Sequence, residues 1–224
     1  MKLLTRLTAI LSFFVMVQYA NAASNNILVD QIGNSSTINF TQTGLGNSIG
    51  DPTNHAIING NSNAITIDQI GSNNTAAYSV DGDNNTLSHS FTGNYNQLSL
   101  LCVTCSAITM TDTIMGNSNI INRNFDSSAS TSTINITSDN NDVTINNDST
   151  AVSGAQSSVD ISGGNGNQVQ IRQTGAASTN GHDTTLTIVG ATNTVNIDQG
   201  GTVDSNVHAT ITGSGNTMHI NSNY

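Results

Sequence analysis

The sequence predicts an all-β fold: a β-solenoid of strand-arc-strand coils, with about 22 residues per coil and cross-β stacking of like strands. Three observations predict it. Gly-x-x-Asn pairs recur at a spacing of about eleven residues. Between the pairs, apolar residues alternate with polar ones, as in a strand with one buried face. The turns hold Gly and Asn, which tolerate positive φ. Each strand buries too little alone, so copies are expected to stack.

The first 22 residues have the pattern of a secretory signal peptide. Lys2 and Arg6 precede a short apolar run, and Ala20-Asn21-Ala22 supplies a small-x-small cleavage site. The apolar run is shorter than the roughly 20 residues that a transmembrane helix needs. We therefore expect residues 1–22 to be a signal peptide and residues 23–224 to form one repeat domain.

The composition is polar and acidic. The chain has no Trp, one Pro, 4% aromatic and 8% charged residues. All fourteen acidic residues are Asp, and without Lys2 and Arg6 only Arg123 and Arg172 oppose them, which gives 2 − 14 = −12. Such a charge argues against a nucleic-acid partner. The polarity alone would favour disorder, but the regular alternation of apolar residues favours a folded chain.

The expected strands follow one frame along the chain. In the clearest copies one face reads Asn, apolar, apolar, Gln, as in Asn63, Ile65, Ile67 and Gln69. In chain order the frames cover residues 36–44, 63–71, 74–80, 85–91, 96–102, 119–125, 141–147, 167–175, 193–201 and 216–222. The intervening positions are polar and are expected to face water.

Inward amides are costly to bury unless they are paired, and stacking places like amides above one another. A column of identical amides lets each side chain donate to one neighbour and accept from the other. We therefore expect an inward amide ladder formed by Asn47, Asn63, Asn74, Asn85, Asn96, Asn167, Asn193, Asn216, Gln42, Gln69, Gln173 and Gln199.

The frame has departures. The Gln position is taken by Val80, Phe91, Cys102, Ile114 and Asn147 in other copies. Coils are expected to lengthen at residues 48–54, 151–157 and 176–183, and Arg123 falls on an inward position.

Two stretches carry a family resemblance. Gln42-Thr43-Gly44-Leu45-Gly46-Asn47 has the form QxGxGN, and Gln69-Ile70-Gly71-Ser72-Asn73-Asn74 has the form QxGxxN. These stretches resemble the repeat of curlin, the amyloid subunit of bacterial curli fibres. The resemblance implies a β-solenoid that is exported with the help of a periplasmic chaperone and an outer-membrane secretion pore. It also implies that the protein polymerises at the bacterial cell surface into extracellular fibres, which serve in adhesion and in the biofilm matrix. The departures from the frame also leave room for a minor or nucleating subunit.

Polymerisation is also expected on physical grounds. The repeats begin at Ile27 and continue to Tyr224, with no helix-forming segment or charged block to serve as a cap. An uncapped end rung exposes unpaired backbone groups that invite another strand. The expected partners are therefore further copies of the chain, in a homopolymer, and a nucleator or major curlin subunit.

Cys102 and Cys105 form a CxxC motif without the βαβ pattern of a redox enzyme. A local disulfide that pins an arc is the favoured reading, with free or intermolecular thiols as alternatives.

The five His residues are dispersed without ligand spacing, so we expect no metal site and no cofactor. No nucleophile elbow frames a Ser, so we expect no enzyme.

The alternative function is a monomeric secreted β-solenoid binding module, such as an adhesin or an ice-binding protein. It draws on expected outward threonines, for example Thr185 and Thr187. The outward positions vary among Thr, Asp, Gln, Ser and Arg from coil to coil, which favours the fibre.

Overall fold

The structure, a computed structural model, describes residues 26–50, 56–71, 73–93, 95–115, 118–137, 140–152, 154–164, 166–177, 182–190, 192–200, 205–213 and 215–222. These residues form fifteen β-strands and no helix. Every strand pairing among them is parallel. The expected signal peptide lies outside the described residues.

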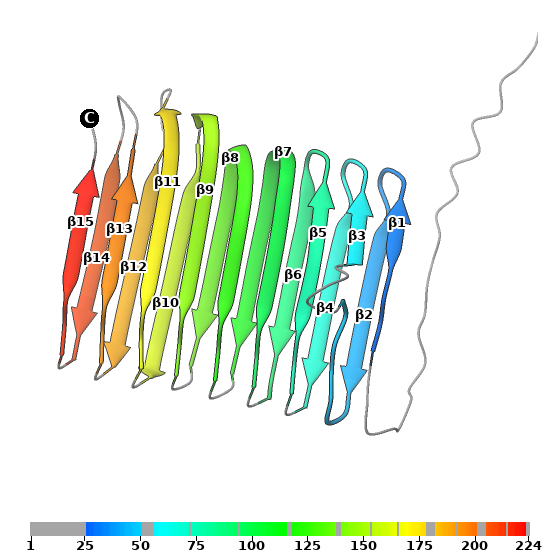
Figure 1. The fold of residues 1–224 in the computed structure, drawn as a ribbon, viewed down its shortest axis with the longest axis horizontal. Helices are drawn as coiled ribbons and strands as arrows, with labels where there is room; N and C mark the ends of the chain where they lie inside the picture. Colours follow the sequence, from blue (N-terminus) through cyan, green and yellow to red (C-terminus); the bar gives the residue numbers. More distant parts are fainter. Residues whose placement is uncertain are drawn as a thin grey trace, which may run out of the picture.

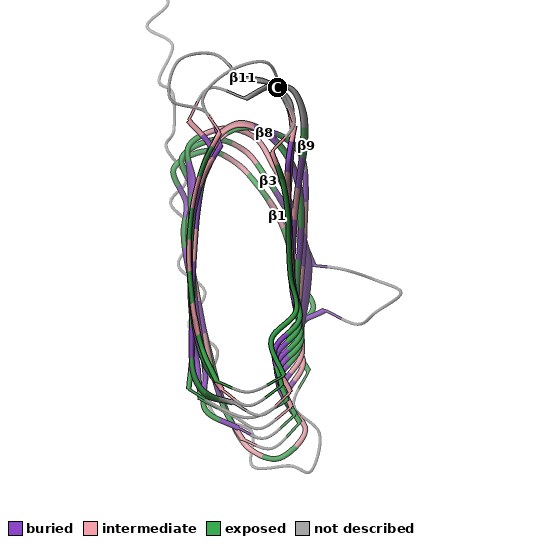
Figure 2. Ribbon diagram, turned by 90° about the vertical axis from the view of Figure 1, so that its left-hand side faces the viewer, coloured by how far each residue is buried: buried purple, intermediate pink, exposed green. Residues whose placement is uncertain are grey.

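The strands wind into a flattened solenoid with two walls (Figures 1 and 2). The first wall contains, in spatial order, β1 (Asp30–Ile32), β3 (Ala56–Asn59), β5 (Ala76–Asp81), the start of β7 (Leu98–Ile114), the start of β8 (Ile121–Ile136), β9 (Val143–Val152), β11 (Val169–Ala177), β13 (Val195–Gln199) and β15 (Met218–Ser222). The second wall contains β2 (Thr37–Thr43), β4 (Ala64–Ile70), β6 (Asn85–Phe91), the ends of β7 and β8, β10 (Gln156–Gly164), β12 (Asp183–Gly190) and β14 (Asn206–Thr212).

The two longest strands, β7 and β8, belong to both walls. The first part of β7 pairs with β5 and its last part pairs with β6. The register between β7 and β8 shifts between Cys102 and Cys105, where β7 passes from one wall to the other. The chain thus turns this corner without leaving the β conformation.

The solenoid makes about seven turns of about 23 residues. Equivalent asparagines are 22 or 23 residues apart in the regular coils and 26 or 27 apart in three longer ones. The longer coils are those that contain residues 48–54, 151–157 and 176–183, parts of which lie outside the described residues. The predicted all-β solenoid is confirmed.

Burial alternates along each strand as the sequence predicts. β2 alternates strictly between exposed and buried residues, and in β4 the buried positions are Ile65, Ile67 and Gln69. Parallel register places Ile65 beside Ile38 and Leu87, so aliphatic side chains form continuous columns in the interior. The apolar core therefore runs along the solenoid between the walls.

The arcs at the bottom of Figure 1, which lead from the second wall to the first, need glycine for close packing. A Cβ added to Gly71 would lie 1.6 Å from the carbonyl oxygen of Gly44, and one added to Gly93 would lie 1.2 Å from that of Gly71. Stacked backbones meet here with no room for a side chain, which explains the glycine of the Gly-x-x-Asn pairs.

The arcs at the top of Figure 1 are held by side-chain oxygens. The Oδ1 atom of Asn34 accepts from the backbone N–H of Asn61 at 2.8 Å, and the Oδ1 atom of Asn61 accepts from that of Asp83 at 2.7 Å. Asp83 in turn accepts from the backbone N–H of Ser106 at 2.9 Å. Hydrogen bonds from Ser106 hold the pKa of Asp83 below its ordinary value. Each arc is thereby tied to the next.

Candidate functional site

A continuous ladder of asparagine amides runs along the interior at the start of the first-wall strands. From Asn74 onward, each Nδ2 atom donates to the Oδ1 atom of the preceding coil, at 2.6 or 2.7 Å in six steps and at shorter range from Asn216 to Asn193. The ladder comprises Asn47, Asn74, Asn96, Asn119, Asn141, Asn167, Asn193 and Asn216. All of them except Asn216 are buried. The hydrogen bonds all point the same way, so the ladder has a donor end and an acceptor end.

Asn119 and Asn141 belong to this ladder although we did not predict them as members. Asn119 donates to Asn96 at 2.7 Å, and Asn141 donates to Asn119 at 2.6 Å. Their signal in the sequence was present, because each begins a strand frame and Asn119 follows Gly116 in a Gly-x-x-Asn pair.

Asn63 and Asn85 lie buried at the start of second-wall strands, and their side chains bond to backbone groups rather than to one another. Their Nδ2 atoms donate back to the carbonyl oxygens of Gly60 and Gly82, both at 2.8 Å. The Oδ1 atom of Asn85 accepts from the backbone N–H of Asn63 at 2.8 Å. These asparagines close their own turns, because a three-residue offset brings the glycine carbonyl within reach of the side chain.

Gln42 and Gln69 are buried and stack in register, and their amides bond to the backbone rather than to one another. Gln69 donates to the carbonyl oxygen of Thr75 at 2.9 Å, and Gln42 makes reciprocal hydrogen bonds with the backbone of Ser48. Each side chain is one methylene longer than Asn, so it reaches around the lower arc to the next backbone segment. These glutamines therefore fasten the second wall to the first.

Gln173 and Gln199 are also paired in register, and their amides also turn away from one another. Gln173 donates to the hydroxyls of Ser157 and Thr184, both at 3.1 Å. Gln199 donates to the carbonyl oxygen of His182 at 2.6 Å. Within the described residues, neither Oε1 atom receives a hydrogen bond. Both amides bond across the core to residues at or just before the start of second-wall strands rather than to one another.

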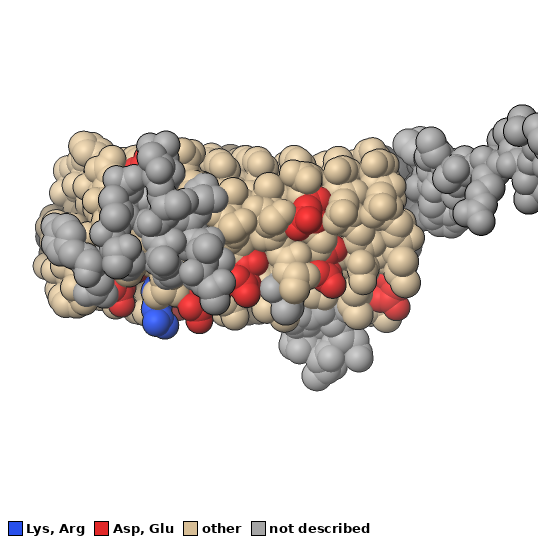
Figure 3. Space-filling model, turned by 90° about the horizontal axis from the view of Figure 1, so that it is seen from above, with Lys and Arg blue, Asp and Glu red and all other residues tan. Residues whose placement is uncertain are grey.

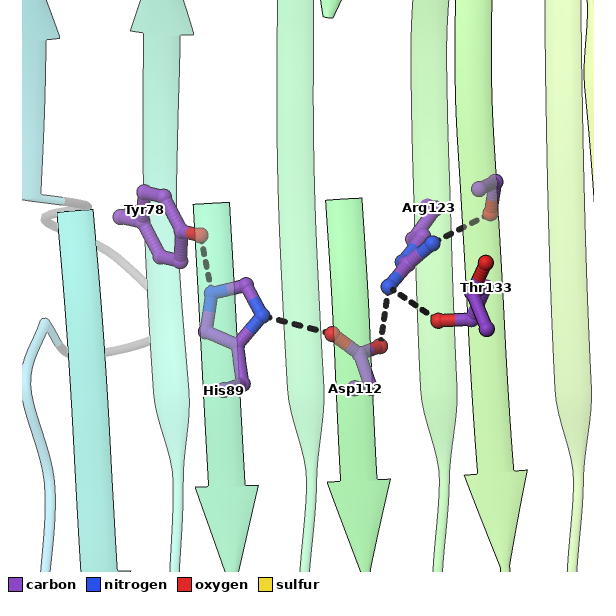
Figure 4. Close-up of polar contacts among 6 residues, drawn as sticks. Tyr78, His89, Asp112, Arg123 and Thr133 are labelled. Atoms are coloured by element: carbon purple, nitrogen blue, oxygen red, sulfur yellow. Dashed lines mark hydrogen bonds and ion pairs between the residues drawn. The ribbon is translucent and has the colours of Figure 1, made fainter. Parts of the chain in front are cut away.

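A second polar element crosses the core between the walls (Figure 4). Tyr78 on β5 and His89 on β6 share a hydrogen bond, and His89 Nδ1 lies 2.6 Å from an Asp112 carboxylate oxygen on β7. The other carboxylate oxygen lies 2.6 Å from the guanidinium of Arg123 on β8. Arg123 also donates to the hydroxyl of Ser132. We call Tyr78, His89, Asp112 and Arg123 the buried network.

Burial and charge act in opposite directions on Asp112. Desolvation alone raises its pKa, but Arg123 and His89 more than offset this effect, so the pKa lies below its ordinary value. Burial raises the pKa of the Tyr78 hydroxyl well above its ordinary value; the Asp112 carboxylate adds to the rise and Arg123 opposes it. The network therefore contains an ionised carboxylate paired with a guanidinium.

The chemistry open to this network is limited by its burial. Tyr78, Asp112 and Arg123 are 0% exposed and His89 is 1% exposed, so no side chain of the network meets solvent. An acid–base pair needs contact with a substrate to catalyse a reaction. The geometry fits a structural tie that joins three coils and both walls.

The two cysteines are joined by a disulfide. Both are buried and lie where β7 passes from the first wall to the second. The bond closes a short loop at this corner and so restricts the path of the chain between the walls.

The described residues show little else of chemical interest. Among them, no group of three or more His, Cys, Asp or Glu side chains could hold a metal ion. In the same part of the chain, no helix has the length and apolar character to cross a membrane.

Comparison with known proteins adds one finding. Residues 60–88, which include β4, β5 and the start of β6, match the family model described as the curlin associated repeat. The same comparison found no match among curated proteins and none among solved structures.

Proposed function

We propose that this curlin-repeat protein is a secreted structural subunit that assembles head to tail into curli-like extracellular fibres, which serve in adhesion and in the biofilm matrix. The observation that carries the proposal is the exposed inner face of the last described coil. Met218 and Ile220 occupy inward positions of the frame, yet they are 52% and 43% exposed. Their register partners Val195 and Ile197 are 1% and 0% exposed.

The backbone supports the same proposal. In the described part of the chain, β15 pairs only with β13 and β14 pairs only with β12. At the opposite end, β1 pairs only with β3 and β2 only with β4. Unpaired strand edges with an apolar inner face favour the addition of another strand. Because the two ends differ, the contact is heterologous and the chain of subunits does not close.

The asparagine ladder gives the fibre a direction. The Nδ2 atoms of the ladder donate toward the preceding coil. Asn216 lies in the last described coil and donates to Asn193, which leaves its Oδ1 atom facing away from the ladder. In the proposed fibre, an incoming subunit continues this order by placing an amide donor against the Oδ1 atom of Asn216.

The proposed partners follow from the family resemblance. They are further copies of this chain, a nucleator or major curlin subunit, a periplasmic chaperone and an outer-membrane secretion pore. Residues 1–22 direct the export in this proposal, and the protein acts at the bacterial cell surface as a structural component rather than an enzyme.

The test is assembly of residues 23–224 from denaturant at neutral pH. We expect thioflavin-positive fibrils after a lag, a lag that fibril seeds shorten, and a diffraction spacing of about 4.8 Å along the fibril. A folded β spectrum with no fibrils after days at micromolar concentration overturns the proposal and favours the monomeric binding module.

A further inference from the structure

The outward residues of the second wall differ from those of the first. On three successive coils, β6, β7 and β8 present eight hydroxyl side chains and one amide in three rows. The rows are Thr86, Thr109 and Thr131; Ser88, Thr111 and Thr133; and Ser90, Thr113 and Asn135. All nine are exposed or half-buried. We call these nine residues the hydroxyl face.

Charge is segregated around this face. None of the nine residues is ionisable, and the nearest outward-facing charged residues of the second wall are Asp68 on β4 and Asp160 on β10. The first wall places several acidic residues outward, together with Arg172 on β11, which lies in register with Asp198 on β13. Asp126 and Asp148 follow the register pair Phe125 and Asn147 on neighbouring strands. Figure 3, which looks down on the upper edge of the solenoid, shows acidic side chains along that edge and a basic side chain among them. Like charges oppose contact between two first walls, whereas hydroxyl faces meet without that repulsion.

The geometry of the hydroxyl face selects its partner. Neighbouring side chains within a row lie about 4.8 Å apart, because the strands are parallel neighbours. Successive rows lie about 6.7 Å apart along the strands. A second copy has the same two spacings, so its rows match over any length. Thr is short and stiff at χ1, which keeps the entropy cost of ordering such a surface low. The face also contains no aromatic ring on which a sugar could stack.

We propose that the hydroxyl face packs against the hydroxyl face of a second copy in a neighbouring filament, so that fibres pair side by side through their second walls. This inference rests on the proposed fibre. Small side chains on matched sheets interdigitate in the manner of paired cross-β sheets.

The size of the face determines when pairing occurs. Three coils and three rows cover about 300 Å² per subunit, well below the roughly 800 Å² per partner of a stable complex. Monomers therefore do not pair through it. In a fibre the face recurs once per subunit, and many weak contacts act together. Pairing is thus a property of the fibre alone.

The test measures mass per length of fibrils by scanning transmission electron microscopy. Thr111→Asp places one negative charge at the centre of the hydroxyl face. Asn122→Asp places the same charge on an exposed outward position of β8 in the first wall, and it is the matched control. We expect wild-type and Asn122→Asp fibrils to have about twice the mass per length of Thr111→Asp fibrils. Should Thr111→Asp fail to give fibrils, Ser88→Asp in the same row replaces it.

Three results overturn the inference: wild-type fibrils with the mass of one filament, loss of pairing in both variants, and pairing retained in both. Failure of the fibre itself is a separate result, because the wild type then gives no thioflavin signal and no fibrils to weigh. Paired filaments that separate only in Asn122→Asp assign the contact to the first wall instead.

Discussion

Arg123 reaches across the core from the first wall and places a guanidinium nitrogen 2.6 Å from the carboxylate of Asp112 on the second wall, with neither side chain exposed. The two residues lie on successive strands, β7 and β8. Removing one partner of such a pair leaves an uncompensated charge in the interior. The pair therefore favours the native stacking of these coils over other registers.

Replacing Arg123 by Met should lower the free energy of unfolding by about 3–5 kcal/mol, because the buried Asp112 carboxylate loses its guanidinium partner and keeps only the His89 ring beside it. The double variant Arg123→Met with Asp112→Leu should recover much of the loss, because the charge is removed with its partner. Denaturant titration of soluble protein measures both. Equal destabilisation by the single and double variants would contradict the role of the pair.

Stability should fall in acid through Asp112. Its folded pKa lies below its ordinary value, so the ionised form stabilises the fold fully above the unfolded pKa of about 3.9. That contribution is lost as the pH falls through the lower folded pKa. The difference in unfolding free energy between wild type and Asp112→Asn should be constant above about pH 4 and shrink below it. A difference that stays constant in strong acid argues against an ionised Asp112.

Replacing Asn119 by Ala should cost about 1–3 kcal/mol, because it leaves the acceptor of Asn96 and the donor of Asn141 without their ladder partner. Asn122→Ala, on the outward face nearby, is the control and should be nearly neutral. Chemical denaturation of both variants makes the comparison. An equal loss of unfolding free energy in the two variants would show that the ladder hydrogen bonds of Asn119 contribute no more to stability than the exposed side chain of Asn122.

Ile220→Lys should block the open end of the solenoid, because the charge would enter the apolar contact with the next subunit. Growth from wild-type seeds should fall strongly, and small amounts of the variant should slow wild-type elongation by capping fibre ends. Asn221→Lys is the matched control, since Asn221 pairs with the outward residue Asp198. Thioflavin kinetics distinguish the two, and similar growth in both would rule out contact through this rung.

The inward and outward faces could be read from the sequence because they depend only on alternation within a strand. Ile65 and Ile67 are buried as their spacing predicts. Partners between coils could not be read in the same way. Asp112 contacts His89 only because β7 continues around the arc and places Asp112 in register with His89 on β6. No local sequence pattern predicts that β7 continues through the arc.

The glutamines show the same limit. Alternation predicts correctly that Gln69 is buried, but not which group its amide meets. That choice depends on the path of the following arc, which brings the carbonyl oxygen of Thr75 within 2.9 Å. Side-chain length and loop geometry together decide it, and a repeat pattern contains neither.

The longer coils have a practical consequence. Asn74 bonds directly to Asn47 at 2.7 Å although 27 residues separate them, while the next step spans 22 residues. Extra residues can thus leave the stack through an arc without changing the spacing of the ladder. A foreign peptide grafted at such an arc would be displayed once per subunit at regular intervals, which makes this chain a scaffold for ordered surface presentation.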